Sequence, residues 1–195
     1  MMDFSTLEPF YGQMRDVCVD YYKSEKEMTV FQLAEACMDL PGLPMHCPPH
    51  HFLMPAVLLT ACHKAKNDPV EYLEEDLDEA CKRAHNVLGG FCGNYGSCGS
   101  AVGVGIFMSI FTQSGPCSQG TWAWTNMATA NALTDIAKID GPRCCKRNTY
   151  LALLSACDTI AERLNITLEK PEDIVCKYHA QNKECKGTAC PFFRK

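Results

Sequence analysis

Gly89 to Ile110, reading GGFCGNYGSCGSAVGVGIFMSI, is the stretch of the sequence that decides how the chain is organised. It holds seven of the chain's thirteen glycines and two cysteines, Cys92 and Cys98, followed by a run of small and apolar residues. Glycine loses more backbone entropy on folding than any other residue, so a cluster of glycines indicates unusual backbone angles or a close approach by another group. We predict a loop that brings the two cysteines towards one point and leads into a buried helix.

The glycines after Cys98 are superficially similar to a nucleotide-binding loop. Such a loop follows a strand, whereas here the residues before the glycines end a predicted helix and no Gly-Lys-Ser/Thr follows. Small residues four positions apart, Gly99 and Gly103, instead permit close contact between helices. We therefore favour packing over phosphate binding, and expect the loop glycines Gly93 and Gly96 to tolerate substitution less well than Gly105.

Length and charge narrow the classes of function. The 195 residues suit one domain, and the formal net charge of -5 argues against a nucleic-acid partner, which normally requires a basic face. No run approaches the roughly 18 apolar residues of a membrane span, and the first ten residues lack the basic and apolar regions of a secretory signal. We expect a cytoplasmic protein without a membrane partner, whose oligomeric state the sequence leaves open.

Cysteine is the unusual feature of the composition, with fourteen in the chain. In a reducing compartment these residues stay as thiols or bind metal. Free cysteine is also among the most buried residue types, and five cysteines lie within apolar helical patterns: Cys18, Cys37, Cys62, Cys81 and Cys157. Seven others have glycine, proline or charged neighbours and are the candidate metal ligands: Cys92, Cys98, Cys144, Cys145, Cys176, Cys185 and Cys190.

Helical periodicity runs through most of the chain, with no convincing strand alternation. Thr29, Asp68 and Asn148 are predicted helix caps, the first in a capping box with Gln32. Pro55 starts or kinks one helix. The expected helices cover 8–22, 29–40, 52–66, 68–89, 101–111, 121–138, 148–164 and a short segment from 171 to 178.

The predicted fold class is all-α, a compact bundle of six to eight helices. Residues 1–175 form a single domain, and 176–195 form a cysteine-rich tail without regular structure that is a candidate metal-binding segment. In the helix expected over 121–138, the candidates for burial are Trp122, Trp124, Met127, Leu133 and Ile136.

Two short segments contain paired cysteines. Cys92 and Cys98 are too far apart in sequence for adjacent turns of one helix, so the residues between them must loop; thiolates suit zinc or iron–sulfur clusters. Cys144 and Cys145 are vicinal, so we expect only one of them to face a shared site. The basic residues beside them, Arg143, Lys146 and Arg147, would favour a reactive thiolate, or else form a solvated turn before the next helix.

The tail reads CKYHAQNKECKGTACPFF and carries Cys176, Cys185 and Cys190. The sequence Cys190-Pro191 is typical of iron–sulfur ligands. We expect the three cysteines to bind metal, with His179 or a cysteine from elsewhere as fourth ligand; the alternative is a frayed tail with incidental thiols.

Histidines gather in the segment 45–51, MHCPPHH. His50 and His51 begin a predicted helix, from which their rings could face a pocket. Histidine there would serve as an acid–base group or a metal ligand, although a single histidine is more often a satisfied structural residue.

Three motifs together resemble an uncharacterised family of cysteine-rich bacterial and archaeal proteins, a domain of unknown function that is frequent in anaerobes. The motifs are His50-His51 with Pro55, the glycine- and cysteine-rich stretch from Gly90 to Gly99, and the segment from Gly141 to Arg147, preceded by Asp140 in place of a glycine. Some relatives are joined to a methyltransferase domain, so the resemblance implies a methyltransferase-type or corrinoid protein partner. It implies no established activity.

The leading hypothesis is a protein that binds an iron–sulfur cluster, or zinc as the alternative, through Cys92, Cys98, Cys144 and Cys145. The tail cysteines would complete this site or form a second one. Whether the protein is an enzyme stays open.

In this hypothesis His50 and His51 line the pocket as candidate catalytic residues, and Arg143 or Lys146 holds an anionic small-molecule substrate. A second hypothesis is a metal-free thiol enzyme with Cys144 or Cys145 as nucleophile, resolved by Cys92 or Cys98. A third is an accessory module that only binds a partner protein.

Overall fold

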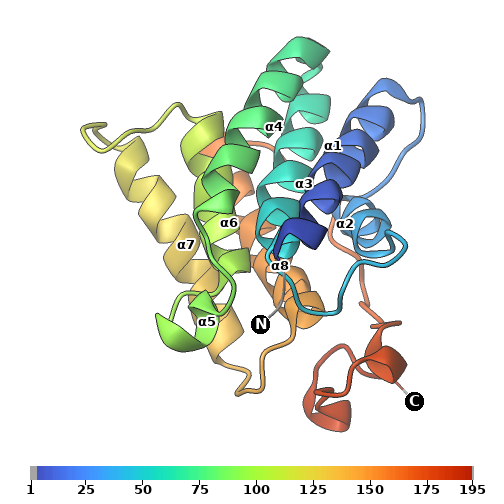
Figure 1. Ribbon diagram of the computed structural model, residues 1–195. Coiled ribbons are helices and arrows are strands. Elements are labelled where there is room, and N and C mark those ends of the chain that lie inside the picture. The colour runs from blue at the N-terminus through green and yellow to red at the C-terminus, as the bar shows by residue number, and fades with distance from the viewer. Residues whose placement is uncertain (1–3, 195) are drawn as a thin grey trace.

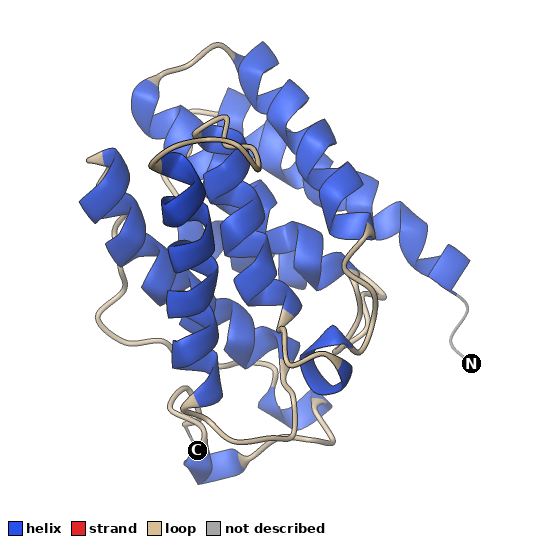
Figure 2. Ribbon diagram, turned by 90° about the vertical axis from the view of Figure 1, so that its left-hand side faces the viewer, coloured by secondary structure: helices blue, strands red, loops and turns tan. Residues whose placement is uncertain are grey.

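A computed structural model describes residues 4–194, and this part of the chain consists of helices joined by loops (Figures 1 and 2). The α-helices are α1 (Glu8–Lys23), α2 (Val30–Met38), α3 (Pro49–Lys66), α4 (Val70–His85), α5 (Phe91–Asn94), α6 (Gly99–Phe111), α7 (Thr121–Ala137) and α8 (Cys145–Leu164). Three short 3₁₀ helices are η1 (Phe4–Leu7), η2 (His179–Gln181) and η3 (Gly187–Ala189). The predicted all-α fold is confirmed, and no strand occurs among the described residues.

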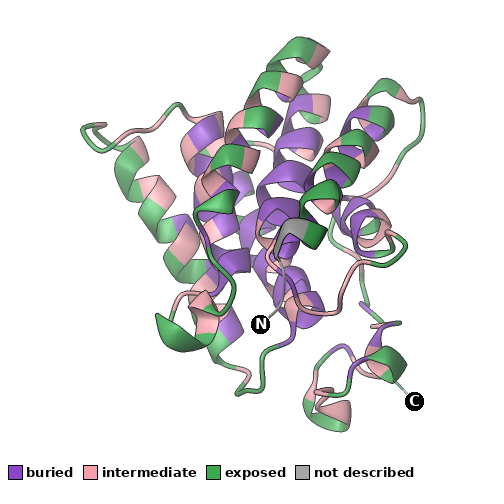
Figure 3. Cartoon of the chain, in the orientation of Figure 1, coloured by how far each residue is buried: buried purple, intermediate pink, exposed green. Residues whose placement is uncertain are grey.

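α3 is the central helix of the bundle, with α1, α2, α4 and α6 packed around it. Residues 52–60 are buried without a break, so this helix has no polar face, as Figure 3 shows. Each fully buried leucine or phenylalanine on it contributes about 2 kcal/mol through the hydrophobic effect. Pro55 lies inside the helix, which begins six residues earlier at Pro49. Across residues 4–194, none of the helices has both the length and the apolar character that a membrane crossing requires.

Glycines bring α6 close to α3 and α7. A Cβ atom at Gly99 would lie 2.0 Å from Cδ2 of His51, and one at Gly103 would lie 2.6 Å from Cβ of Met54. The predicted close helix contact through these two glycines is confirmed. The expectation for Gly93 is wrong, because a Cβ atom there would meet nothing within 4 Å.

The poor tolerance of substitution expected at Gly96 is confirmed, whereas the better tolerance expected at Gly105 is wrong. Gly96 has a φ of +65°, which disfavours side chains whatever the space. A Cβ atom at Gly105 would lie 2.0 Å from Oγ1 of Thr129 on α7, so Gly105 is a contact glycine of the bundle.

Helix starts are where the sequence predictions fail most. The capping box of Thr29 and Gln32 at α2 is confirmed, with both reciprocal hydrogen bonds present. Asp68 does not cap α4, because its carboxylate bonds to the His63 ring instead. Asn148 does not cap α8, which begins after Cys144. The short helix expected over 171–178 is absent, and this segment is a loop.

α7 lies at the edge of the bundle (Figure 1) and buries less than its sequence predicts. Its buried residues are Ala128, Ala132 and Ile136. Trp122 and Met127, both expected to be buried, are exposed, because no other element covers the outer face of this helix.

The tail is irregular, as predicted, but it is docked rather than frayed. Ile174, Tyr178 and Phe192 are buried in the main core. The Tyr178 hydroxyl donates to Oδ1 of Asp39, the C-cap residue of α2, at 2.9 Å, and the Phe192 ring meets the Tyr150 ring of α8 edge-on at a centroid distance of 5.3 Å. These contacts hold the tail against α2 and α8.

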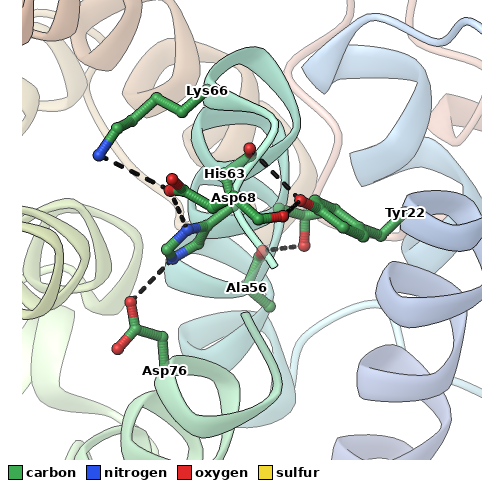
Figure 4. Close-up of polar contacts among 7 residues, drawn as sticks. Tyr22, Ala56, His63, Lys66, Asp68 and Asp76 are labelled. Atoms are coloured by element: carbon green, nitrogen blue, oxygen red, sulfur yellow. Dashed lines mark hydrogen bonds and ion pairs between the residues drawn. The ribbon is translucent and has the colours of Figure 1, made fainter. Parts of the chain in front are cut away.

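A buried histidine between two carboxylates ties α3 to α4 and to the loop between them (Figure 4). Nδ1 of His63 lies 2.8 Å from Oδ2 of Asp68, and its Nε2 lies 2.9 Å from Oδ2 of Asp76. Burial alone lowers the pKa of His63, but the hydrogen bonds and charges of Asp76 and Asp68 outweigh it and raise the pKa above its ordinary value. The Tyr22 hydroxyl of α1 donates to the Asp68 carbonyl and joins a third helix to this cluster.

Candidate functional site

Four cysteines from distant parts of the sequence line one small cavity. The cavity has a volume of about 20 Å³ and lies where the tail meets the start of α8. The same end of the molecule carries α5 and the α7–α8 connection (Figure 1). The four cysteines are Cys144, Cys176, Cys185 and Cys190. The tail cysteines therefore meet Cys144 of the vicinal pair rather than forming a site of their own.

Cys144 occupies the N-cap position of α8. Its Sγ accepts a hydrogen bond from the backbone N–H of Arg147 at 3.4 Å, which satisfies a free donor of the first turn. Burial raises the pKa of Cys144. The backbone N–H and the positive charge of Arg147 oppose that rise, as does the backbone N–H of Lys146. The start of α8 thus presents a sulfur to partial positive charge, as sites that bind thiolates do.

A hydrogen-bonded relay links Cys144 to the tail and to the segment before α3. The buried Asn182 donates from Nδ2 to the Cys144 sulfur at 3.5 Å. Its Oδ1 lies 3.2 Å from Nε2 of His46, and Nδ1 of the same imidazole accepts from the Cys145 N–H at 3.3 Å. Because Nδ1 accepts, Nε2 carries the proton and His46 is neutral in this arrangement.

The tail cysteines are held by short turns. The Cys176 N–H donates to the Phe192 carbonyl at 2.8 Å, which closes the tail into a loop. The Gly187 N–H donates to Sγ of Cys185 at 3.4 Å, and the Cys190 N–H donates to the Gly187 carbonyl at 2.9 Å.

The pKa of Cys176 depends on the charges of the other three cavity cysteines. Burial raises the pKa of Cys176, a backbone hydrogen bond from Tyr178 opposes the rise, and the charges of the other three cysteines add to it. Removing a proton from one thiol therefore disfavours its removal from the next, unless a cation compensates.

Cys145 points away from the four-cysteine cavity, as the vicinal spacing predicts. The Cys47 N–H donates to its sulfur, and Cys98, Cys47 and Cys144 are close enough to raise the pKa of Cys145 further. Burial raises the pKa of Cys145 to about 12, and burial does the same to the pKa of Cys47. Neither thiol ionises readily at neutral pH, which counts against Cys145 as a free nucleophile.

The two histidines at the start of α3 have different surroundings. His51 is bonded from Nδ1 to the Val87 carbonyl at 2.7 Å and packs on Gly99. His50 is fully buried and its Nδ1 lies 3.2 Å from both the carbonyl oxygen and the sulfur of Cys47. Nε2 of His50 is buried with no hydrogen-bond partner among the described residues. Burial, followed by the nearby charge of Lys146, lowers the pKa of His50 well below its ordinary value, so the ring is neutral.

The basic residues of the 143–147 segment separate into three environments. Arg143 is exposed at the rim of a groove. Lys146 is buried, with Nζ donating to the Met38 carbonyl at 3.2 Å and lying 4.9 Å from the centre of the Tyr178 ring. Burial lowers the pKa of Lys146. Arg147 lines both the four-cysteine cavity and the groove. Nothing in the sequence distinguishes it from the neighbouring basic residues.

Cys92 and Cys98 lie in that groove and not in the four-cysteine cavity. Cys98 is buried, and its sulfur accepts a hydrogen bond from Nδ2 of Asn148 at 3.3 Å. The structure therefore divides the seven candidate ligands: four line the cavity, Cys92 and Cys98 line the groove, and Cys145 lines neither.

The cavity is lined by side chains of the type that metal–thiolate centres use as ligands. Four sulfurs with peptide and amide N–H donors are the ligands and outer-shell contacts that such centres use. As the side chains stand, no three His, Cys, Asp or Glu residues within 4–194 are grouped closely enough to hold a metal ion. All fourteen cysteines are free thiols.

The sulfur contacts of two residues of the candidate site were not predicted from the sequence. Asn182 and Asn148 each donate to a cysteine sulfur, yet asparagine in a polar segment carries no signal for this contact. Cys47 lies in the histidine-rich segment that the sequence did single out.

The fold and the site together define an all-helical, cysteine-rich protein whose tail returns to the first turn of its last long helix. The chain belongs to DUF5714, a family of unknown function, whose family model matches residues 18–193. Comparison with curated proteins and with solved structures finds no match. The resemblance read from the three sequence motifs, to a family of unknown function, is confirmed.

Proposed function

We propose that this protein is a metal-binding protein whose metal–thiolate centre is formed by Cys144, Cys176, Cys185 and Cys190. The observation that carries the proposal is the cavity that these four cysteines line together. They come from a helix start and from the tail, and no disulfide joins them, although Cys176 and Cys190 also pack against the hydrophobic core.

The hydrogen bonds around the sulfurs support a thiolate state. Cys144 accepts from Asn182 and from the Arg147 N–H, and Cys185 accepts from the Gly187 N–H. Donors aimed at sulfur stabilise the negative charge of a bound thiolate and tune the metal that it holds. The raised pKa values of Cys144 and Cys176 mean that the metal itself supplies the remaining stabilisation, so its binding releases protons.

An iron–sulfur cluster is the proposed cofactor, with a single zinc ion as the alternative. Cys190-Pro191 is the type of ligand sequence found at iron–sulfur sites, whereas four thiolates on short turns also suit structural zinc. A cluster would give the protein a redox role. Both versions place it in a reducing compartment, proposed to be the cytoplasm, where its fourteen thiols persist.

The metal-free thiol enzyme is less well supported. Burial raises the pKa of Cys144 and raises that of Cys145 to about 12, so neither thiol has the lowered pKa of a reactive nucleophile. The accessory role beside a methyltransferase-type partner stays a prediction from the family resemblance.

Anaerobic purification followed by metal analysis and a visible spectrum tests the proposal. We expect iron with a broad visible absorption for a cluster, or zinc without colour. Serine at each of the four cavity cysteines should remove most of the metal, while Cys117→Ser, at an exposed cysteine away from the cavity, should retain it.

Cys92→Ser distinguishes this centre from the site first predicted with Cys92 and Cys98. Retention of metal in Cys92→Ser and loss in Cys185→Ser supports the tail-based centre. The reverse pattern, or a wild-type protein that contains neither iron nor zinc, overturns it.

A further inference from the structure

A groove of about 360 Å³ lies beside the four-cysteine cavity. Its walls come from the Cys92–Cys98 loop, the end of α7, the loop before α8 and the first turn of α8. A groove of this volume is at the lower end of the range for small-molecule sites. The residues that give it chemical character are Cys92, Cys98, Ile136, Arg143, Arg147 and Asn148.

Arg147 is the feature that points to a ligand. The residue is only 4% exposed, yet it lines the groove. Nη2 donates to the Pro142 carbonyl at 3.0 Å and Nε donates to Oδ1 of Asn148 at 3.4 Å. Nη1 makes no hydrogen bond to the described residues and is not one of their fully buried unpaired atoms, so its N–H groups reach the solvent. A guanidinium that two bonds hold in place while a third nitrogen stays open is a preorganised donor for a planar acceptor.

The charges around the groove set the charge of that acceptor. Arg143 is exposed at the same groove, so two guanidinium groups face it. Asp140 also lines it, and Oδ1 of its carboxylate accepts from the Gly141 N–H at 2.7 Å. Two positive charges and one negative charge leave one positive charge, which matches a monoanion better than a phosphate dianion.

The opposite wall is apolar and comes from Leu133, Ile136 and Ala137 at the end of α7. A ligand of this groove thus needs a planar anionic head for the arginines and a short aliphatic part for α7. We propose that the groove binds a small aliphatic carboxylate, with its head group on Arg147 and Arg143. This site lies outside the metal centre and does not depend on metal being bound.

The position of the site next to the cysteines follows from shared residues. Arg147 lines both the groove and the cavity. Lys186 of the cavity wall donates from Nζ to the carbonyls of Asp140 and Gly141 at 2.8 and 2.7 Å, which anchors the groove's loop to the tail. A carboxylate on Arg147 therefore lies between the Cys92–Cys98 pair and the four-cysteine cavity.

Calorimetric titration of the purified protein with butyrate tests this site. Butyramide, which has the same carbon chain but no charge, is the control ligand. We expect saturable binding of butyrate and none of butyramide. Arg143→Ala should weaken butyrate binding about tenfold, because a charge-assisted contact is lost. Arg147→Lys should weaken it at least as much, since lysine keeps the charge but not the paired donors.

Arg163→Ala is the control, because Arg163 lies in the last turn of α8, away from the groove. It should leave butyrate affinity unchanged. Arg143 is exposed, so its variant folds even if the buried Arg147 variant does not. No saturation up to about 10 mM butyrate, or equal affinity in Arg143→Ala and wild type, overturns the proposal. Metal content measured on the same samples separates this failure from failure of the metal centre.

Discussion

Cys144 and Cys145 show how one backbone position separates two thiols. Cys144 is extended, with φ −144° and ψ 108°, and caps α8, whereas Cys145 is the first helical residue. The side chain of Cys144 meets the tail, and that of Cys145 meets the Cys47 N–H. Identical residues therefore have different chemistry, and only Cys144 is placed to share a ligand with the tail cysteines.

Thiol labelling should reflect this difference. With a pKa of about 12, on the order of one Cys145 side chain in 10⁵ is a thiolate at pH 7, and the same fraction holds for Cys47. Cys117 is exposed. Iodoacetamide at pH 7, read by mass spectrometry of peptides, should modify Cys117 first and leave Cys47 and Cys145 unmodified until the protein unfolds. Labelling of Cys145 as fast as Cys117 would revive the thiol-enzyme hypothesis.

Asn148 links the glycine loop to α8 through a single amide. It donates to the Cys98 sulfur and accepts from Nε of Arg147, so Asn148→Ala leaves a buried guanidinium without one of its acceptors. We expect a loss of about 1–3 kcal/mol in unfolding free energy, measured by urea denaturation. Asn131→Ala on the exposed surface of α7 is the matched change and should stay within about 0.5 kcal/mol of wild type.

At the scale of elements, the contact between α3 and α6 depends on glycine. A Cβ atom at Gly103 would approach Met54 Cβ to 2.6 Å and the His51 carbonyl oxygen to 3.0 Å, and neither group can rotate away. Gly103→Ala must push the helices apart, which we expect to cost about 2–3 kcal/mol.

Gly93→Ala is the contrasting change, because the helical α5 has open space at that position. It should be neutral or stabilise the fold by up to about 1 kcal/mol through reduced entropy of the unfolded chain. Thermal unfolding followed by circular dichroism compares the two variants. A larger loss for Gly93→Ala than for Gly103→Ala would show that the loop, and not the helix contact, determines stability.

The same contact shows what sequence could predict about the helices. Spacing of Gly99 and Gly103 along one helix face indicated a close neighbour, and apolar periodicity located the long helices. Helix starts were harder, because they depend on where a side chain finds its partner. Asp68 has the residue type of a cap, but the ring of His63 takes its carboxylate. Cysteine is an uncommon helix cap, so the sequence pattern favours Asn148 over Cys144.

The candidate site was predicted in its residue types but not in its grouping. The sequence separates the cysteines beside glycine, proline and charge from those in apolar helical patterns, although Cys98 is also part of the hydrophobic core. Which of them meet is decided by the docking of the tail through Tyr178 and Phe192, and such long-range contacts leave no periodic pattern. The roles of Asn182 and Arg147 depend on the same docking and could not be predicted.

At the scale of the whole molecule, the histidines make the unfolding free energy depend on pH in two opposite ways. His46, His50 and His51 have pKa values lowered mainly by burial. Their contribution is complete above the unfolded-state value of about 6.5 and is lost as the pH falls below it. His63 has the opposite sign, because Asp76 and Asp68 raise its pKa.

The contribution of His63 is complete below about pH 6.5 and is lost as the pH rises through its higher folded-state value. Unfolding free energy should therefore pass through a maximum near neutral pH. His63→Gln should cost about 1–2 kcal/mol at pH 6 and less at pH 9, because glutamine keeps hydrogen bonding but not the charge between two carboxylates. The loss should shrink as the proton leaves the wild-type ring.

His85→Gln is the control for this measurement. His85 also has a raised pKa, which burial opposes and the Cys81 carbonyl and the Glu8 carboxylate favour, but it lies at the surface. Screening by water and salt makes such an exposed pair weak, so its variant should follow the wild-type pH profile closely. Urea denaturation from pH 5 to pH 9 gives all three curves. A constant difference between His63→Gln and wild type across this range would mean that His63 stabilises the bundle by packing against Phe111 and not through its proton.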